Sequence, residues 1–187
     1  MFYTRKGDSG TTKVFSSAPG ERLSKASSQI EALGSLDELN SFLGLCKVQA
    51  GEWKFRVGAS GPLLRELIHE VQENLFIVQA ELAGAQKSID ESKIRKMEEV
   101  IDVIEHELPP LKGFSIAGGS ELSALLDVAR TLARRAERRV VEALRRGEVK
   151  IEDSTVSFLN RLSSLIFALA RLANHKFGIK EEPPSYR

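Results

Sequence analysis

Cysteine is nearly absent from this sequence, since Cys46 is the only one among 187 residues. A single cysteine excludes an internal disulfide and any metal site built from several cysteines, and it is typical of a reducing compartment. An excess of charge of one sign is also missing, because 27 lysines and arginines face 26 aspartates and glutamates, for a formal net charge of +1. This balance gives no overall field for a nucleic acid, so any basic cluster must act locally.

Long uninterrupted apolar runs are lacking as well. Residues 1–8 contain no apolar stretch of the signal-peptide kind. The most apolar segment, residues 158–173, is interrupted by Asn160, Arg161 and Arg171. We therefore expect a cytoplasmic protein that has neither a membrane span nor a nucleic-acid partner.

Helical periodicity is what the sequence contains in abundance. Apolar residues recur at three- and four-residue spacing in five segments, and glycine or proline marks most of their ends. The expected helices span residues 27–49, 62–84, 92–108, 119–146 and 154–177. No strand pairing is expected, so the predicted fold is all-α, a bundle of about five helices. We expect a single domain over residues 1–187, with a glycine-rich loop at 1–25 and the bundle at 27–178.

The fourth expected helix carries a high density of arginine. Arg130, Arg134 and Arg138 form one row at four-residue spacing, with Glu137 beside them at the edge of the apolar stripe. Like charges in such a row destabilise an isolated helix, so a partner must offset them. Two kinds of partner are open: carboxylates such as Asp127 on a solvated face, or an anion held by several guanidinium groups, for which polyphosphate fits best.

The N-terminal loop has a composition that suits phosphate binding. Residues 4–12 combine two glycines, which let backbone N–H groups approach a ligand, with cations and hydroxyls that contact phosphate oxygens. The same composition also makes ordinary turns, and the segment is not a Walker loop. The candidate ligands are Thr4, Arg5, Lys6, Gly7, Asp8, Gly10, Thr12 and, at the end of the loop, Lys25.

Two helix positions and one loop position are further candidates. Asp37 shares a face of the first helix with two glycines, so it is either a surface acid or the partner of an arginine across an interface. The polar stripe of the last helix includes Asn160 and Arg171, which we expect to bond to a ligand or to another segment. Phe114 lies in residues 112–121, the only stretch of extended character, and is either a core residue or the wall of a ligand site.

Three motifs in order resemble one family. Tyr3–Thr12 is similar to the nucleotide loop Y-T-[RK]-x-G-D-x-G, and Glu31–Ser41 is similar to the helix motif E-x-x-G-x-x-D-E-L-N-S. Ala129–Arg138, followed by Phe158–Ser163, resembles the pair A-R-x-x-x-R-R-A-E-R and L-N-R-L-S. Over nearly its whole length the chain thus resembles the PduO-type ATP:cob(I)alamin adenosyltransferases.

This resemblance implies a five-helix bundle that forms a homotrimer, with active sites between subunits. It implies transfer of the 5′-deoxyadenosyl group of ATP to cob(I)alamin, with Mg²⁺ on the triphosphate and no metal site of the protein's own. The N-terminal candidates and Lys25 would surround the triphosphate, and the bundle would complete the ATP site with Arg134, Arg135, Glu137, Arg138 and Asn160. Asp37 would pair with Arg130 across the subunit boundary. Phe114 would displace the lower axial base of the corrin.

The sequence departs from the family pattern at Lys6, Ala26, Ala117 and Ser164, and none of these departures removes a principal phosphate ligand. A reductase or an acceptor enzyme is a possible transient partner. A different class of protein also stays open: a non-catalytic ATP-binding bundle that serves as a sensor. Such a sensor would not need Phe114 or the Gly118–Gly119 turn.

Overall fold

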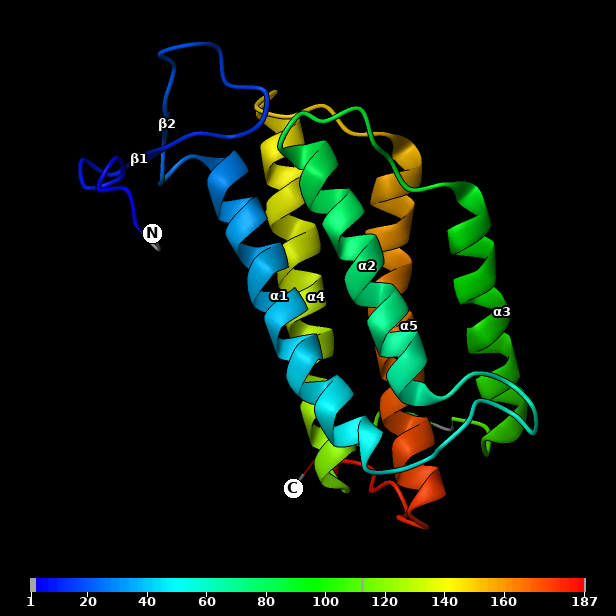
Figure 1. The fold of residues 1–187 in the computed structure, drawn as a ribbon. Helices are drawn as coiled ribbons and strands as arrows, with labels where there is room; N and C mark the ends of the chain where they lie inside the picture. The colour runs from blue at the N-terminus through cyan, green and yellow to red at the C-terminus, as the bar shows by residue number, and fades with distance from the viewer. Residues whose placement is uncertain (1–2, 112, 187) are drawn as a thin grey trace.

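The structure is a computed structural model that describes residues 3–111 and 113–186. Its helices run side by side along one direction (Figure 1) and confirm the all-α prediction. Each lies within two residues of its expected bounds. They are α1 Ser28–Gly51, α2 Leu64–Leu82, α3 Glu91–Glu107, α4 Glu121–Arg145 and α5 Asp153–Lys176. Lys112, the first residue of the segment expected to be extended, lies outside the described residues, as do residues 1–2 and 187.

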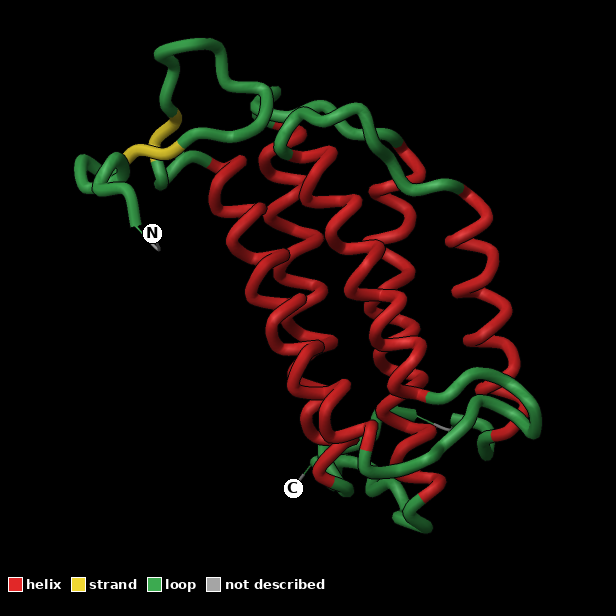
Figure 2. Tube along the Cα trace, in the orientation of Figure 1, coloured by secondary structure: helices red, strands yellow, loops and turns green. Residues whose placement is uncertain are grey.

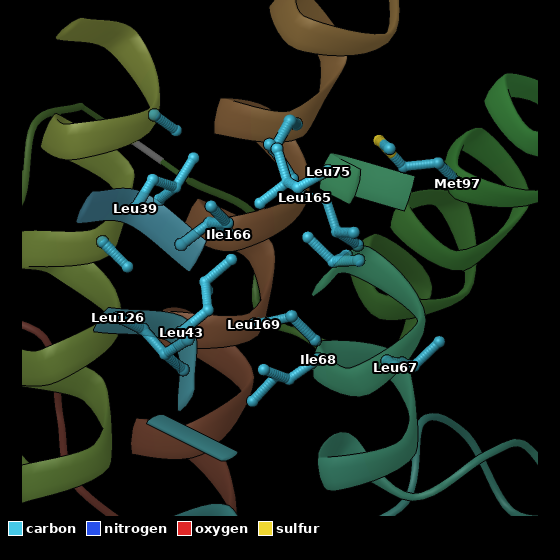
Figure 3. Close-up of a cluster of buried hydrophobic side chains, with 14 of the residues drawn as sticks. Leu39, Leu43, Leu67, Ile68, Leu75, Met97, Leu126, Leu165, Ile166 and Leu169 are labelled. Carbon is cyan, nitrogen blue, oxygen red and sulfur yellow. The ribbon is translucent and has the colours of Figure 1, made fainter. Parts of the chain in front are cut away.

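The helices pack in the order α2, α1, α4, α5, α3, because α1 contacts both α2 and α4, and α5 contacts both α4 and α3. Their apolar faces meet in a single core, in which Leu39 and Leu43 of α1 approach Leu126 of α4 and Ile166 of α5 (Figure 3). By length and composition α5 could cross a membrane, but 61% of its apolar window is buried inside the bundle. Burial of this kind is what the interior helix of a bundle requires.

Buried polar groups accept hydrogen bonds at the first turns of α5 and α4. The carboxylate of Glu81, at the end of α2, is 6% exposed. It accepts a hydrogen bond from the backbone N–H of Glu152 over 2.7 Å and another from the Thr155 hydroxyl. These bonds satisfy donors at the start of α5 that lack a partner within the helix. Ser120 caps α4 in the ordinary way, with its hydroxyl oxygen accepting from the N–H of Ser123.

Residues 3–25 form a segment that we call the N-terminal hook. The expectation that this part of the chain holds no strand was wrong, because β1 (Thr11–Thr12) pairs antiparallel with β2 (Leu23–Ser24). Two residues per strand are too few to show an alternating pattern in the sequence. The hook projects from the bundle beside the start of α1 (Figures 1 and 2).

Candidate active site

The arginines of α4 divide between two sides of the helix. Arg135 and Arg139 face α1, where Arg135 pairs with Glu38 and Arg139 Nε lies 3.6 Å from Glu31 Oε1. For these two arginines, the partners that offset the charge are carboxylates and not a bound anion. Arg135 lies outside the pocket described next, so this chain alone does not place it with the other predicted ATP ligands.

The other side of α4 borders a cavity of about 650 Å³, which we call the arginine pocket. Its lining consists of Arg134, Glu137, Arg138, Val141, Glu142, Arg145, Arg146 and Asn160. Within residues 3–111 and 113–186, no carboxylate lies within 4.0 Å of the guanidinium of Arg134 or Arg138. Four arginines face two glutamates, one of which, Glu142, pairs with Arg146 over 2.7 Å, so the pocket keeps an excess of positive charge of the kind that suits an anion with several charges.

Asn160 and Glu137 meet at this pocket. Asn160 Nδ2 donates a hydrogen bond to Glu137 Oε1 over 3.0 Å, so the prediction that Asn160 bonds to another helix is confirmed. The Asn160 side chain is exposed at the mouth of the pocket. The position therefore suits contact with a ligand that enters from solvent.

Arg130 lies one helical turn from Arg134, outside the pocket lining. Its guanidinium carbon lies 5.9 Å from the centre of the Phe167 ring, and its Nε lies 4.0 Å from Asp127 Oδ1. That Nε is buried and donates no hydrogen bond to any described residue. Asp37 lies on the exposed face of α1 and does not pair with Arg130 within the described chain.

The N-terminal hook is shaped by Arg22, which the sequence analysis missed. Arg22 Nε donates to Thr11 Oγ1 over 2.7 Å, and its Nη2 donates to the carbonyls of Thr11 and Lys6. Lys25 Nζ donates to the Gly7 carbonyl over 3.0 Å, and the Lys25 N–H donates to the Gly10 carbonyl over 2.9 Å. No motif marks Arg22, because its partners are mainly backbone oxygens of a turn.

The structure thus gathers the predicted hook residues with one another but not with the arginine pocket. Thr4, Arg5, Lys6, Gly7, Asp8 and Gly10 form a series of turns that lead into β1, where Thr12 lies. These turns extend away from the bundle on the α1 side, whereas the arginine pocket is bordered by α4 and α5 (Figure 1). One chain therefore carries two separate groups of phosphate-binding candidates.

A second cavity, of about 630 Å³, lies at the other end of α4. Its walls come mainly from the Phe114 loop, which we define as residues 109–119, and the C-terminal tail, residues 179–186, and α5 completes them with Arg171 and His175. Phe114 is 82% exposed, so it is a wall of this apolar cavity and not a core residue. The tail is bonded to the Phe114 loop, because the Glu182 carbonyl accepts a hydrogen bond from the N–H of Ile116 over 2.8 Å.

One row of side chains on α4 leads from the Phe114 loop to the arginine pocket. Asp127 accepts a hydrogen bond from the N–H of Gly118 over 2.9 Å, which ties the helix to the Phe114 loop. Arg130, Arg134 and Arg138 follow Asp127 at spacings of three and four residues, the spacing of one helix face. The rise of an α-helix puts Asp127 about 10 Å from Arg134 along the axis. A ligand that spans both cavities would run along this row.

These features define a class: helical-bundle proteins with an arginine-rich pocket on one helix and an apolar cavity beside the loop that precedes that helix. The profile of the family described as cobalamin adenosyltransferase matches residues 2–173, and the chain belongs to this family.

Relatives of known type agree with this assignment. The chain is 40% identical over 180 residues to the corrinoid adenosyltransferase PduO of Citrobacter freundii, covering 92% of this chain and 50% of that protein. It is 38% identical to the corrinoid adenosyltransferase of Bacillus subtilis, covering 95% and 88% of the two chains. The chain spans about half the length of the PduO proteins that it matches.

A solved structure has the same fold. It is a variant PduO-type ATP:corrinoid adenosyltransferase from Lactobacillus reuteri complexed with cobalamin and ATP. It superposes with a TM-score of 0.85 at 32% identity, over 99% of both chains.

Proposed function

We propose that this protein transfers the 5′-deoxyadenosyl group of ATP to cob(I)alamin, forming adenosylcobalamin and releasing triphosphate. The observation that carries the proposal is the arginine pocket, in which Arg134 and Arg138 have no carboxylate partner among the described residues. The neighbouring cavity around Phe114 is apolar and large enough for part of a flat macrocycle. Family membership supports both assignments.

The proposed chemistry asks for positioning and charge stabilisation. Co(I) is itself the nucleophile: it forms a bond to C5′ of the ribose while the C5′–O5′ bond breaks and the electron pair leaves with the triphosphate. No general base is needed. Arginines arranged before the reaction stabilise the charge that develops on the leaving group, and the Phe114 loop aligns the corrin with C5′. The row from Asp127 to Arg138 gives ATP a path between the two cavities.

We further propose a homotrimer whose active sites are shared between subunits. The hook projects beside the start of α1 (Figure 1), whereas the arginine pocket is lined by residues of α4 and α5, a separation that a shared site would explain. Among the described residues the Arg130 guanidinium meets a carboxylate only at 4.0 Å, that of Asp127, and its side chain is 30% exposed, while Asp37 is exposed and available to another copy. Leu45 and Val48, on the same helix as Asp37, are 50% and 68% exposed, a degree of apolar exposure that suits a covered surface.

Mg²⁺ fits this site as an ion that arrives with the nucleotide. The described residues contain no cluster of three or more His, Cys, Asp or Glu side chains that could hold a metal. Mg²⁺ in nucleotide sites is usually held by one or two carboxylates together with phosphate oxygens. Glu137 and Glu142 line the arginine pocket and could supply such a carboxylate.

We propose a cytoplasmic setting in which a reductase supplies cob(I)alamin.

The direct test mixes the protein, MgATP and chemically reduced cobalamin and follows the absorption spectrum of adenosylcobalamin. Product formation at a rate proportional to enzyme supports the proposal. Tight ATP binding without product would overturn it and favour the sensor alternative.

The shared site has its own test. An Arg134→Ala chain and a Lys25→Ala chain, each with a different affinity tag, are co-expressed, and mixed oligomers are purified through both tags. A shared site predicts that the mixed oligomers regain activity, because an intact pocket of one chain meets an intact hook of the other. Inactive mixed oligomers would refute it.

A further inference from the structure

We infer that Arg171 and Asn174 of α5 are positioning residues that hold the Phe114 loop at its two ends and so place Phe114 against the corrin. The inference rests on the proposed function for the identity of the ligand. Arg171 and Asn174 both bond to backbone carbonyls of this loop, and Arg171 also bonds to the C-terminal tail.

Arg171 holds the beginning of the loop and the tail together. Its Nε lies 3.0 Å from both carboxylate oxygens of Glu181, and its Nη2 donates to the Pro109 carbonyl over 3.1 Å. The side chains of Arg171 and Glu181 are only 12% and 25% exposed, so water screens their ion pair less than it would at the surface. A planar guanidinium can bind both partners at once, which an ammonium group cannot do in the same geometry.

Asn174 holds the other end of the loop. It is 5% exposed, its Oδ1 accepts from the N–H and the hydroxyl of Ser120, and its Nδ2 donates to the Gly118 carbonyl over 2.8 Å. Gly118 and Gly119 have φ of 109° and 121°, a region that residues with side chains rarely adopt. A Cβ on Gly119 would lie 2.5 Å from Asn174 Oδ1, so the turn and the amide fit together closely.

The two anchors act as a pair because residues three apart lie on the same face of a helix. Between them, the loop presents Phe114 with 82% of its surface exposed. An exposed segment that is not anchored loses conformational entropy when a ligand orders it, and that loss weakens binding. The N–H of Ile116, bonded to Glu182, adds a third fixed point from the tail. The anchors therefore present Phe114 in a fixed position before cobalamin binds.

The test compares Arg171→Gln, Glu181→Gln and Asn174→Ala with the matched control Arg161→Gln. Arg161 is also on α5 and pairs with Glu98 over 2.9 Å, on the side of the helix that faces α3. Two quantities are measured: the KM for cob(I)alamin and for ATP, and the hydrogen exchange of amides in residues 109–120. In the Arg171 and Asn174 variants we expect the KM for cobalamin to rise about tenfold, the size of effect expected when a charged or buried hydrogen bond is lost.

The KM for ATP should stay within about twofold of wild type in the three variants, since none of the three residues lines the arginine pocket. Exchange should become faster at Gly118 and Ser120 in Asn174→Ala and at Ile116 in Arg171→Gln and Glu181→Gln. The control should match wild type in both readouts.

Unchanged exchange and an unchanged KM for cobalamin would overturn the inference. So would equal losses for both substrates together with faster exchange across all helices, because that pattern shows a role in stability only. A wild-type protein without activity would count against the proposed function, and the exchange readout, which needs no substrate, would then decide the anchoring by itself.

Discussion

Asn160 Nδ2 donates to Glu137 Oε1 over 3.0 Å, and this bond joins α5 to α4 at the arginine pocket. Glu137 is the carboxylate nearest in sequence to Arg134 and Arg138, yet its oxygens lie beyond 4.0 Å from both guanidiniums. By holding the Glu137 carboxylate, Asn160 helps to keep the two arginines available for an anion.

Arg134→Ala should remove most of the activity, whereas Arg135→Ala should retain most of it. Arg134 lines the pocket in which the triphosphate is proposed to leave, and loss of one group that stabilises such charge lowers kcat by about 100-fold or more. Arg135 pairs with Glu38 on the α1 side, an exposed pair that contributes little to stability. Steady-state kinetics with purified proteins of equal melting temperature check this. Equal loss in both variants would contradict the division of α4 into two sides.

Phe114→Ala should keep ATP binding and stability while losing most of the rate that starts from cob(II)alamin. The side chain is 82% exposed, so its removal leaves no cavity in the core. It lines the apolar cavity, where its ring would take the place of the axial base. Calorimetry with ATP, thermal unfolding and the cob(II)alamin-dependent rate are the three measurements. Wild-type kinetics in this variant would remove the proposed role.

Gly119→Ala should disturb the Phe114 loop, and Gly113→Ala should not. Gly119 has φ of 121°, and a Cβ there would lie 2.5 Å from Asn174 Oδ1. A Cβ on Gly113 meets no atom within 4 Å. We expect a rise in the KM for cobalamin only in the Gly119 variant, because the strained turn must shift. Wild-type KM for cobalamin in Gly119→Ala would show that the turn tolerates a side chain.

Glu81→Ala should lower the free energy of unfolding by about 2–3 kcal/mol, because the Glu152 N–H and the buried Thr155 hydroxyl lose their acceptor. The control is Glu91→Ala, which removes an exposed ion pair with Arg95 and should change stability by less than about 1 kcal/mol. Urea unfolding followed by circular dichroism measures both. Similar values for the two variants would contradict the proposed capping of α5.

Cys46 should resist thiol reagents in the folded protein. Burial raises the pKa of its thiol from 9.0 to about 12, so the reactive thiolate is scarce at pH 8. In the unfolded chain the thiol ionises near its ordinary pKa, so the unfolded state loses a proton that the folded state keeps. Stability contributed by this group is therefore complete below pH 9 and is lost as pH rises from 9 towards 12. Reaction with a chromogenic disulfide, with and without urea, measures the difference.

The helices and the core of the site could be predicted because both depend on local periodicity. Arg134, Arg138 and Glu137 share one stretch of α4, and the spacing alone puts the two arginines in one row. Asn160 could be expected to bond to another helix because an amide in an apolar helix needs a partner. That Arg135 faces Glu38 could not be predicted, since it depends on how α4 is rotated against α1.

The anchors of the loops were not predictable for a different reason. Arg22, Arg171 and Asn174 bond largely to carbonyl and N–H groups of turns, which every residue possesses and no motif records. The position of such turns follows from the whole fold. The sequence could show only that Arg171 needed a partner, and the tail supplied Glu181.

The bonds of Arg22 within the hook have a consequence for how a nucleotide is captured. Because one guanidinium already joins β1 to the turn at Lys6, the segment does not have to find its shape when a phosphate group arrives. The entropy of ordering it is lost during folding and not during capture, so more of each phosphate contact contributes to affinity. A hook without that guanidinium would still carry the same phosphate-binding candidates, but it would bind the nucleotide more slowly and release it more readily.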